Sequence, residues 1–374
     1  MDLLNKSSKK CILENDKLEN ILENILKKRK IPIISKNAFF KKIQKEFIYY
    51  YKKNSKIINE SNIHLSELNK ISNNDSYFIA EKFQKKIKEL KYCYVFHYEN
   101  NVIYFKSNKK IIKKIPEKIM YMFILILTLK DLFHRSHCSQ QIIFYDLYDK
   151  KSIPLKKNSY IDQENCNSAF CTVQYDEKIN GPIVLFRNEE CLKVLIHELI
   201  HANFIDYQII QGEGVKEMSS KICTKYPILL NEGFTETFAS LIHMIFISTI
   251  TKINMNTIFK NEVLHNLVIF NKLINYYNID KIEDILVSHG CVSEFKQKTN
   301  VFSYYIIKII NYLNINNFLK LFKDQCHANY QVNQSFNLLF VKFINQKIEK
   351  MNDYIIKNKN KTNSLKLTCY ELNL

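Results

Sequence analysis

The chain has 374 residues, of which 46% are apolar and 25% are charged, and this balance excludes an intrinsically disordered protein. A chain of this length can bury a large core, most simply in two lobes. The formal charge of +18 would favour nucleic acid or an anionic membrane as a partner. However, only three of the 55 basic residues are arginines, namely Arg29, Arg135 and Arg187. Arginine reads base edges through paired hydrogen bonds, so its scarcity argues against a nucleic-acid partner.

The lysine excess, together with abundant asparagine and isoleucine, is typical of an AT-rich coding genome, such as that of a large DNA virus or an intracellular parasite. The N-terminus has no apolar core of the length found in signal peptides. The longest apolar run, Met120 to Leu129, is too short to span a bilayer. We therefore expect an intracellular, cytoplasmic protein without a membrane anchor. The ten cysteines include no CxxC pair and are expected to be reduced, and Cys166 with Cys171 would be the first pair to test for a disulfide if the protein were exported.

Residues 1 to 90 are predicted to be helical and rich in lysine. One amphipathic helix covers Leu18 to Leu26, and two more are expected at Phe39–Ile58 and Tyr77–Leu90. The four cations at residues 27 to 30 could serve as a nuclear import signal, although cations at the end of a helix are the commoner reason for such a run.

The pattern then changes to aromatic and β-branched residues. Strands are predicted at Tyr92–Tyr98 and Val102–Lys106, joined by a hairpin turn at residues 99 to 101. A long apolar helix follows over residues 116 to 134. Three further strands are expected at Ile142–Tyr148, Ala169–Tyr175 and Ile183–Phe186.

The stretch from Cys191 to Phe204 contains His197-Glu198-Leu199-Ile200-His201. Residues four apart share one face of an α-helix, so His197 and His201 can ligate the same zinc ion. Glu198 lies beside that face, where it can act as a general base on water without occupying a metal position. Apolar neighbours on nearly every side make this a buried helix, and histidines at such depth need partners. A chance match somewhere in the chain has odds of about one or two in a hundred.

A third protein ligand is expected downstream, in Leu229-Leu-Asn-Glu-Gly-Phe-Thr-Glu236. Glu232 lies 31 positions after His201, which allows one helix to end and a second to begin. Glu236 lies one turn after Glu232, on the same face. Catalytic zinc sites use three protein ligands and water, and a ligating histidine needs an outer-shell acceptor. We therefore assign Glu232 to the metal and Glu236 to the outer shell.

These two motifs, in this order, resemble those of the gluzincin metallopeptidases, the zincin group that includes thermolysin and the relatives of aminopeptidase N. The resemblance covers mainly residues 165 to 240, about a fifth of the chain. The letters HELIHA also occur in clostridial neurotoxin light chains, another gluzincin branch, whereas Asn-Glu-Gly-Phe is more similar to the aminopeptidase side. The subfamily therefore stays open.

The resemblance implies one zinc ion, held by His197, His201 and Glu232. It also implies that Glu198 is the general base and acid. In thermolysin-like members an acid one turn past the ligand glutamate supports a zinc histidine, and Glu236 matches that place.

Two other zincin branches are excluded by the residues themselves. A metzincin would need glycine at position 204 and histidine at position 207, where this chain has Phe204 and Tyr207. A version with an aspartate ligand would use an aspartate soon after the second histidine. Asp206 is expected to lie too near in the same helix to reach back to the metal.

The zincin fold binds the substrate main chain along an edge strand above the metal, as an added strand. Asn167-Ser168-Ala169-Phe170 looks like the Asn-Ala-Phe edge strand of thermolysin-like enzymes, so Asn167 and Ala169 are the expected substrate contacts. The alternative is an ordinary edge strand whose polar residues face water. Aminopeptidases of the resembling family grip the free amino terminus with a Gly-x-Met-Glu-Asn segment. This sequence has none, which favours an endopeptidase.

The oxyanion of the reaction needs a hydrogen-bond donor. In gluzincins a tyrosine or histidine from the C-terminal lobe usually supplies it. The candidates here are Tyr304, Tyr305 and His289, and the two tyrosines are the predicted donors. The other histidines considered are expected to have structural, surface or capping roles: His134, His137, His243 and His265.

The expected fold class is α+β, with a zincin-like catalytic lobe that holds a small mixed sheet and the active-site helix, followed by an α-helical C-terminal lobe. The expected regions are a helical N-terminal region (1–90), the zincin N-terminal lobe (91–206), the helical C-terminal lobe with the third ligand (207–351) and a polar tail (352–374). The predicted function is a zinc metallopeptidase acting on a peptide or protein substrate. Two alternatives stay open: a catalytically silent zincin-fold binding protein, and a basic helical structural or nucleic-acid-binding protein with a chance motif. The sequence makes no prediction of the oligomeric state.

Overall fold

The structure is a computed structural model, and the residues it describes are 16–29, 38–53, 62–65, 78–111, 116–136, 138–174, 179–210, 226, 228–285, 295–325, 334–357, 363–372 and 374. The chain divides into two compact units. We call the first the sheet unit, which comprises Asn37–Lys150 and Asn167–Phe204 together with Leu374. We call the second the helical unit, which comprises Met1–Lys36, Lys151–Cys166 and Ile205–Asn373. The mixed α/β character expected from the sequence is confirmed.

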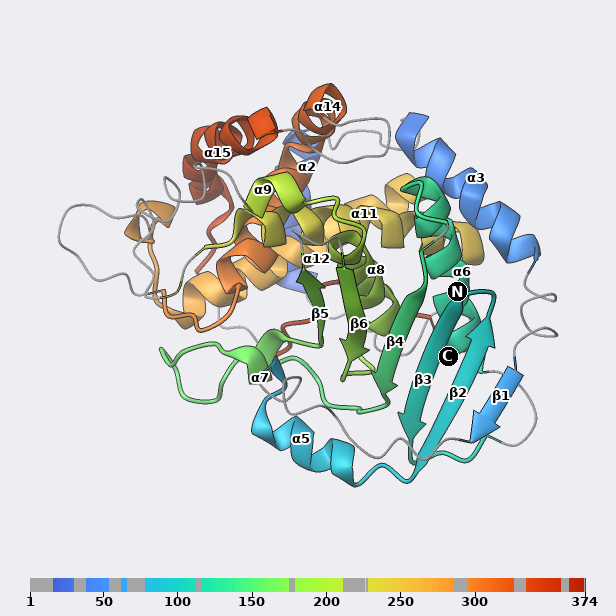
Figure 1. Ribbon diagram of the computed structural model, residues 1–374. Helices are drawn as coiled ribbons and strands as arrows, with labels where there is room; N and C mark the ends of the chain where they lie inside the picture. The colour runs from blue at the N-terminus through green and yellow to red at the C-terminus, as the bar shows by residue number, and fades with distance from the viewer. Residues whose placement is uncertain are drawn as a thin grey trace. The chain divides into compact units, whose positions relative to one another are not determined.

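The sheet unit is built on one mixed sheet, whose described strands follow the order β1-β2-β3-β4-β6-β5 (Figure 1). The strands are β1 (Asn62–Leu65), β2 (Tyr92–Tyr98), β3 (Asn101–Ser107), β4 (Gln140–Tyr145), β5 (Ala169–Gln174) and β6 (Ile179–Leu185). The β3–β4 and β4–β6 pairs are parallel, and the other pairs are antiparallel. The predicted hairpin and the three later strands are therefore confirmed, whereas β1 was not predicted.

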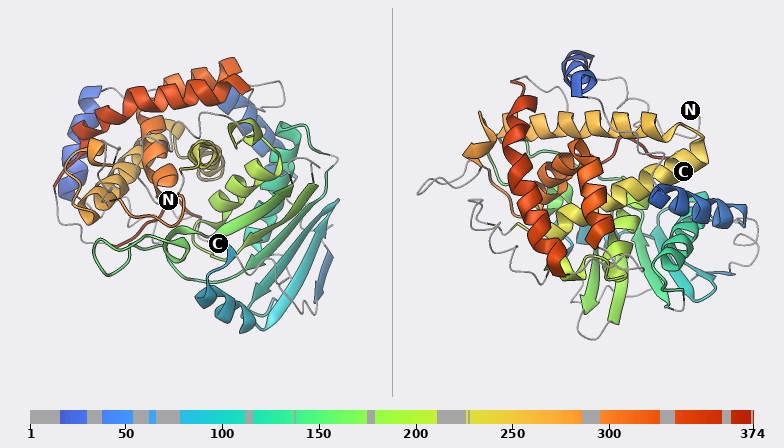
Figure 2. Two further views of the ribbon diagram at one scale, coloured as in Figure 1. Left: turned by 60° about the vertical axis from the view of Figure 1, so that its left-hand side comes forward. Right: turned by 90° about the horizontal axis from the view of Figure 1, so that it is seen from above.

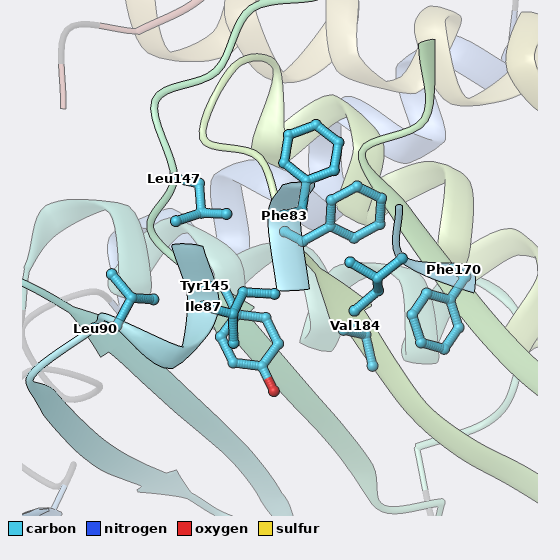
Figure 3. Packing of buried hydrophobic residues seen from close by; sticks show 9 residues of the cluster. Phe83, Ile87, Leu90, Tyr145, Leu147, Phe170 and Val184 are labelled. Carbon is cyan, nitrogen blue, oxygen red and sulfur yellow. The ribbon is translucent and has the colours of Figure 1, made fainter. Parts of the chain in front are cut away.

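The central strands of this sheet bury both of their faces. Tyr145 of β4 and Val184 of β6 belong to an apolar cluster with helix α5 (Glu81–Lys88), which covers one face (Figure 3). Their chain neighbours Phe144 and Leu185 are fully buried as well. Because successive side chains of a strand point to opposite faces, these two belong to the other face.

Three helices of the sheet unit pack one against the next, starting from the helix beside the sheet (Figure 2). Helix α8 (Cys191–Ala202) packs against β5 and β6, α6 (Glu117–Leu132) packs against α8, and α3 (Ala38–Lys52) packs against α6. Every residue of α6 from Ile119 to Lys130 is buried, which confirms the core helix predicted from the longest apolar run. Helix α3 instead buries a single stripe of residues three or four apart, as an amphipathic surface helix does.

The helical unit contains the predicted run of helices after the helix that carries His197 and His201. Its α-helices are α2 (Asp16–Arg29), α7 (Gln163–Cys166), α9 (Tyr207–Ile210), α11 (Leu230–Thr251), α12 (Met255–Tyr276), α13 (Lys308–Leu313), α14 (Ile315–Gln325) and α15 (Gln334–Ile348). Shorter elements are the 3-10 helices η2 (Ile282–Asp284) and η4 (Glu349–Tyr354) and the π-helix η3 (Phe302–Ile307). The region 207–351, predicted to be the helical lobe, begins with α9, and residues 211–225 lie outside the described part.

Helix α11 is the central element of this unit. It packs against η3, α9, α12 and α13 (Figures 1 and 2). Within the described part of the chain it is the one helix long and apolar enough to cross a membrane, but its apolar window is entirely buried. We therefore treat α11 as the core helix of the helical unit.

The close approach of α11 and η3 depends on a glycine. A β-carbon at Gly233 would lie only 2.6 Å from Cγ2 of Ile307. The first turn of α11 therefore has no room for a side chain at position 233. Close packing against η3 explains the glycine next to Glu232.

Residues 363–372 are packed inside the helical unit. For residues 363–372 this contradicts the polar tail predicted for 352–374, because the side chains of Leu365, Leu367, Cys369 and Tyr370 are buried. The backbone polar groups of this segment find buried partners. The carbonyls of Leu365, Lys366 and Leu367 contact the side chains of Tyr305, His265 and Lys308, respectively. Matched backbone groups remove the cost that would otherwise keep such a segment in water.

We expect Gly233→Ala to destabilise the protein by about 1–3 kcal/mol, because the added methyl group would overlap Ile307. The loss should appear even though alanine favours a helix by about 1 kcal/mol over glycine. Chemical denaturation with a chelator present measures it without a contribution from bound metal. Thr257→Ala, at an exposed position of helix α12, is the control and should shift stability by no more than about 0.5 kcal/mol. A Gly233→Ala protein as stable as the wild type would show that η3 does not constrain α11.

Candidate metal centre

Helix α8 brings the two motif histidines together as predicted. His197 and His201 are both buried, and their Nε2 atoms lie 3.1 Å apart. Two nitrogens on one tetrahedral zinc ion lie about 3.3 Å apart, given Zn–N bonds of about 2.0–2.1 Å. The observed distance therefore suits a shared metal. It also suits a hydrogen bond between one protonated and one unprotonated imidazole nitrogen.

The rest of α8 explains why these side chains are held so closely. All twelve residues of the helix are buried, including Glu198. The helix starts after Glu190 (φ 60°) and stops before Phe204 (φ 59°), and both residues adopt the left-handed conformation that is costly for residues other than glycine. Such conformations persist where the surrounding structure determines them, so both ends of α8 are fixed by tertiary packing.

This early end of α8 corrects the prediction for Asp206. The helix ends at Ala202, and Asp206 is therefore not in the same helix as the histidines. Its carboxylate is buried and accepts hydrogen bonds from Asn231 and Thr235 of α11. Asp206 is not part of the group of metal-binding donors that the described residues form.

Glu232 is the third member of that group. It lies in the first turn of α11 and is half-buried. One donor atom from each of His197, His201 and Glu232 lies within 4.8 Å of the other two. Small side-chain rotations reduce such distances to the roughly 3.3 Å of a tetrahedral site. Two imidazole nitrogens and one carboxylate oxygen are a donor set that zinc accepts in catalytic sites, so these residues fit the metal.

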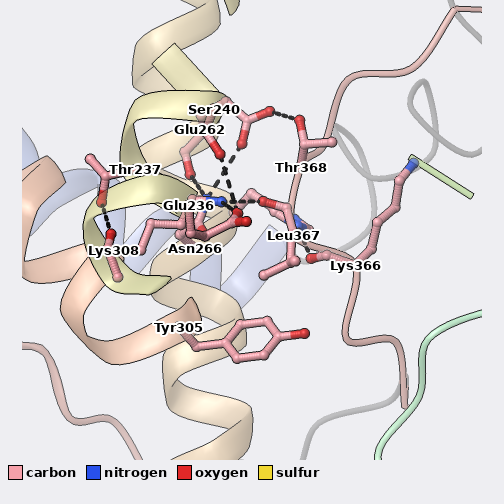
Figure 4. Close-up of polar contacts among 12 residues, drawn as sticks. Glu236, Thr237, Ser240, Glu262, Asn266, Tyr305, Lys308, Lys366, Leu367 and Thr368 are labelled. Carbon is pink, nitrogen blue, oxygen red and sulfur yellow. Dashed lines mark hydrogen bonds and ion pairs between the residues drawn. The ribbon is translucent and has the colours of Figure 1, made fainter. Parts of the chain in front are cut away.

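Glu236, the predicted outer-shell residue, lies in a buried polar cluster (Figure 4). Its Oε1 atom accepts hydrogen bonds from Lys308 Nζ at 3.0 Å and from Ser240 Oγ at 3.3 Å. Lys308 Nζ also donates to the carbonyl of Leu367 at 2.6 Å. The negative charge of Glu236 is therefore compensated by a cation. Its predicted support of a zinc histidine stays a prediction.

A second carboxylate, Glu262, shares this cluster. Burial raises its pKa above the usual value for glutamate, although Lys308 and hydrogen bonds from Thr368 and from the backbone N–H of Cys369 act in the opposite direction. The ion pair within this cluster joins Lys308 to Glu236.

The candidates for the oxyanion donor have different surroundings. Tyr305 is buried, and its hydroxyl donates to the carbonyl of Leu365 at 2.6 Å, which makes it an anchor of the C-terminal segment. Tyr304 is half-buried on the same π-helix, and its role stays a prediction. His289 lies outside the described residues.

The predicted substrate strand is at the edge of the sheet, as expected. Ala169 begins β5, which is the last strand in the sheet order and packs against α8. The carbonyl of Asn167, just before this strand, accepts a hydrogen bond from Nε of the fully buried Arg187 at 3.2 Å. That guanidinium also lies over the ring of Phe83. Arg187 thus holds the start of the edge strand, and substrate binding there stays a prediction.

Several other predictions concern histidines and cysteines. His265 contacts the carbonyl of Lys366 at 2.8 Å and is buried, which confirms its structural role. His243 is also buried, beside the ring of Phe246. The described cysteines, Cys166 and Cys171 among them, form no disulfide bonds.

Three polar residues hold segments of the predicted site, and the sequence analysis assigned none of them this role. Lys308 carries a signal that could have been used, because it is a single charge within the apolar run from Ile306 to Ile310. Asp206 was considered only as a ligand. Arg187 carries no local pattern that distinguishes it from a surface arginine.

The chain matches no family model, no curated protein and no solved structure. The likeness to gluzincins therefore rests on the two motifs and on the donor atoms that they bring together.

We expect Lys308→Met to destabilise the protein by about 3–5 kcal/mol, because it leaves the buried carboxylate of Glu236 without its cation. Glu236→Gln in the same chain should restore a large part of this loss, since it removes the stranded charge. A double-mutant cycle followed by chemical denaturation measures the coupling between the two side chains. The exposed pair of Lys85 with Glu81 is the control and should show a coupling of no more than about 1 kcal/mol. Purely additive effects of the two buried substitutions would contradict the assignment of the ion pair.

Proposed function

We propose that the chain is a zinc-dependent metallopeptidase that hydrolyses internal peptide bonds of a peptide or protein substrate. The observation that carries this proposal is the group of donor atoms from His197, His201 and Glu232, all within 4.8 Å of one another. The donors come from two segments that lie 31 positions apart in the chain, so a chance pentapeptide does not account for them.

The choice of zinc follows from the donor chemistry. Two imidazoles with one carboxylate suit zinc, whereas magnesium and calcium prefer sites built from oxygen alone. Zinc bound there would polarise the scissile carbonyl and lower the pKa of the attacking water.

Glu198 is the residue that moves the proton. It follows His197 directly on the buried helix α8. In the proposed reaction its carboxylate accepts a proton from the attacking water, and the water oxygen forms a bond to the carbonyl carbon. The same proton then passes to the nitrogen of the leaving amine as the C–N bond breaks. Glu198 thus acts first as a base and then as an acid.

The edge strand β5 supports a peptide as the substrate. An edge strand presents backbone N–H and C=O groups that can pair with an extended chain. In the proposed complex the substrate main chain adds to β5 near Asn167 and Ala169. Endopeptidase action is favoured because the sequence has no segment of the kind that grips a free amino terminus in aminopeptidases.

The oxyanion donor would be Tyr304. Tyr305 is the weaker of the two tyrosines, because its hydroxyl already donates to the carbonyl of Leu365. Use of Tyr305 would require this contact to break in the transition state.

One observation favours a second candidate, a structural or nucleic-acid-binding protein in which the motif holds no metal. The Nε2 atoms of His197 and His201 are close enough to hydrogen-bond to each other without any metal. A lysine-rich structural or nucleic-acid-binding protein would use the pair in that way.

We expect purified protein to bind one zinc ion per chain, and Glu232→Ala to lower its zinc affinity by about 100-fold or more, because one of three ligands is lost. Metal analysis after dialysis and competition with a chromogenic chelator measure both quantities. Glu117→Ala is a matched control, since Glu117 also lies in the first turn of a helix. Wild-type protein that takes up no zinc would exclude the enzyme and leave the structural candidate.

We expect Glu198→Gln to keep its zinc and to lower cleavage of a peptide library by about 100-fold or more, because the proton acceptor is lost. Glu89→Gln, at an exposed glutamate, should cleave as the wild type does. Mass spectrometry of the products separates the two peptidase types, since an endopeptidase yields internal fragments. Zinc-bound wild-type protein with no cleavage of any library would favour the silent binding protein.

A further inference from the structure

Asp206 is a buried carboxylate that the proposed mechanism does not use. Its side chain is 0% exposed. One oxygen, Oδ2, accepts hydrogen bonds from Nδ2 of Asn231 and from Oγ1 of Thr235, each at 3.2 Å. A carboxylate taken out of water must be compensated, and these two donors supply part of that compensation.

The two donors lie on either side of the third predicted ligand. Asn231 and Thr235 are four residues apart on α11, so they share one face of its first turns. Glu232 lies between them in the sequence. One oxygen atom therefore holds the turn that carries Glu232 at two points, and this fixes the rotation of the turn about the helix axis.

The first turn of α11 needs such a contact. Leu229 precedes the helix and makes no side-chain cap hydrogen bond, so the usual means of fixing a helix start is missing. Its carbonyl accepts from Ser303 Oγ at 2.8 Å. The negative charge of Asp206 near the helix start is also favoured by the helix dipole. Tertiary contacts thus replace the cap.

Asp206 also follows the histidines closely along the chain. It comes five residues after His201, and five residues span at most about 17 Å. The intervening backbone is held by hydrogen bonds: Nδ2 of Asn203 donates to the carbonyl of Leu199, and the N–H of Phe204 donates to the carbonyl of His201. The segment that leaves His201 therefore leads within five residues to the carboxylate that accepts from Asn231 and Thr235.

We infer that Asp206 is a positioning residue of the proposed zinc centre. It holds the first turn of α11 so that Glu232 presents its carboxylate to the metal, and it raises the zinc affinity of the site without binding the metal itself. This inference rests on the proposed function. Outer contacts of this kind are typically worth about 10- to 100-fold in metal affinity.

The test measures zinc affinity in the full chain by competition with a chromogenic chelator. We expect Asp206→Ala to weaken zinc binding about 10- to 100-fold. Thr235→Val, which removes one donor and keeps the side-chain shape, should weaken it several-fold. The combined variant should bind no more weakly than Asp206→Ala alone, because both changes remove the same contact.

A matched control separates positioning from loss of stability. Thr237→Val removes a buried hydroxyl from the same helix, one that donates to the carbonyl of Gly233 and accepts from Asn311. It should lower the unfolding temperature of the metal-free protein and change zinc affinity by no more than about twofold. Circular dichroism with a chelator present confirms that each variant is folded.

One result would overturn the proposed zinc-dependent function, and a different result would overturn only the positioning role of Asp206. Wild-type protein that binds no zinc removes the proposed function. Wild-type protein that binds zinc, with a folded Asp206→Ala variant of equal affinity, removes the inference alone. Should Asp206→Ala fail to fold, Asn231→Ala combined with Thr235→Val removes both donors and leaves the carboxylate in place. Unchanged zinc affinity in that variant overturns the inference equally.

Discussion

The helical unit depends on the burial of α11, a helix that is apolar over most of its length and yet carries charged residues in its first turns. Removing the carboxylate of Glu236 from water would cost several kcal/mol if no cation were present. Lys308 supplies that cation and is itself completely buried. The lysine in turn donates to the carbonyl of Leu367, so the same charge also holds the C-terminal segment in place. One ion pair thus connects the core helix, the helix that follows η3, and the end of the chain.

The first turn of α11 is fixed by contacts of three kinds. Gly233 allows η3 to pack so closely against α11 that a β-carbon at position 233 would overlap Ile307. Asp206 binds the side chains on either side of Glu232. Ser303, in η3, binds the carbonyl that precedes the helix. Because these contacts act on the helix backbone, on two of its side chains and on the carbonyl before it, this turn has little freedom to rotate. A ligand held in this way loses little conformational entropy on binding a metal, which is the physical basis of a preorganised site.

Much of the fold followed from periodicity in the sequence. The spacing of aromatic and β-branched residues predicted the β2–β3 hairpin, and a continuous apolar run predicted α6. For the site, the four-residue spacing of His197 and His201 was sufficient to place both rings together, because one helix determines their separation. Glu232 required a motif as well, since no local rule brings a residue 31 positions away to the same point.

The incorrect predictions have a common physical cause. The features that they missed depend on residues far away in the sequence. Residues 363–372 follow a run of lysine and asparagine, so the pattern around them indicates a solvated tail. Their burial depends on Tyr305, His265 and Lys308, whose side chains meet the backbone carbonyls. Asp206 was misjudged because the end of α8 is set by the left-handed Phe204, a conformation that no propensity favours for phenylalanine.

The difference between local and long-range contacts also bears on whether the HExxH motif occurs by chance. A chance HExxH sequence places two histidines on one face of any helix, so the close approach of His197 and His201 by itself discriminates little. A chance motif has no reason to be joined by a glutamate from another helix, or to have that glutamate held between Asn231 and Thr235 by a buried aspartate. Burying Asp206 and ordering this turn both oppose folding, and a purely structural helix start could be capped at lower cost by a serine or aspartate at position 229. The arrangement is better explained by a requirement to orient Glu232 than by a requirement to stabilise α11.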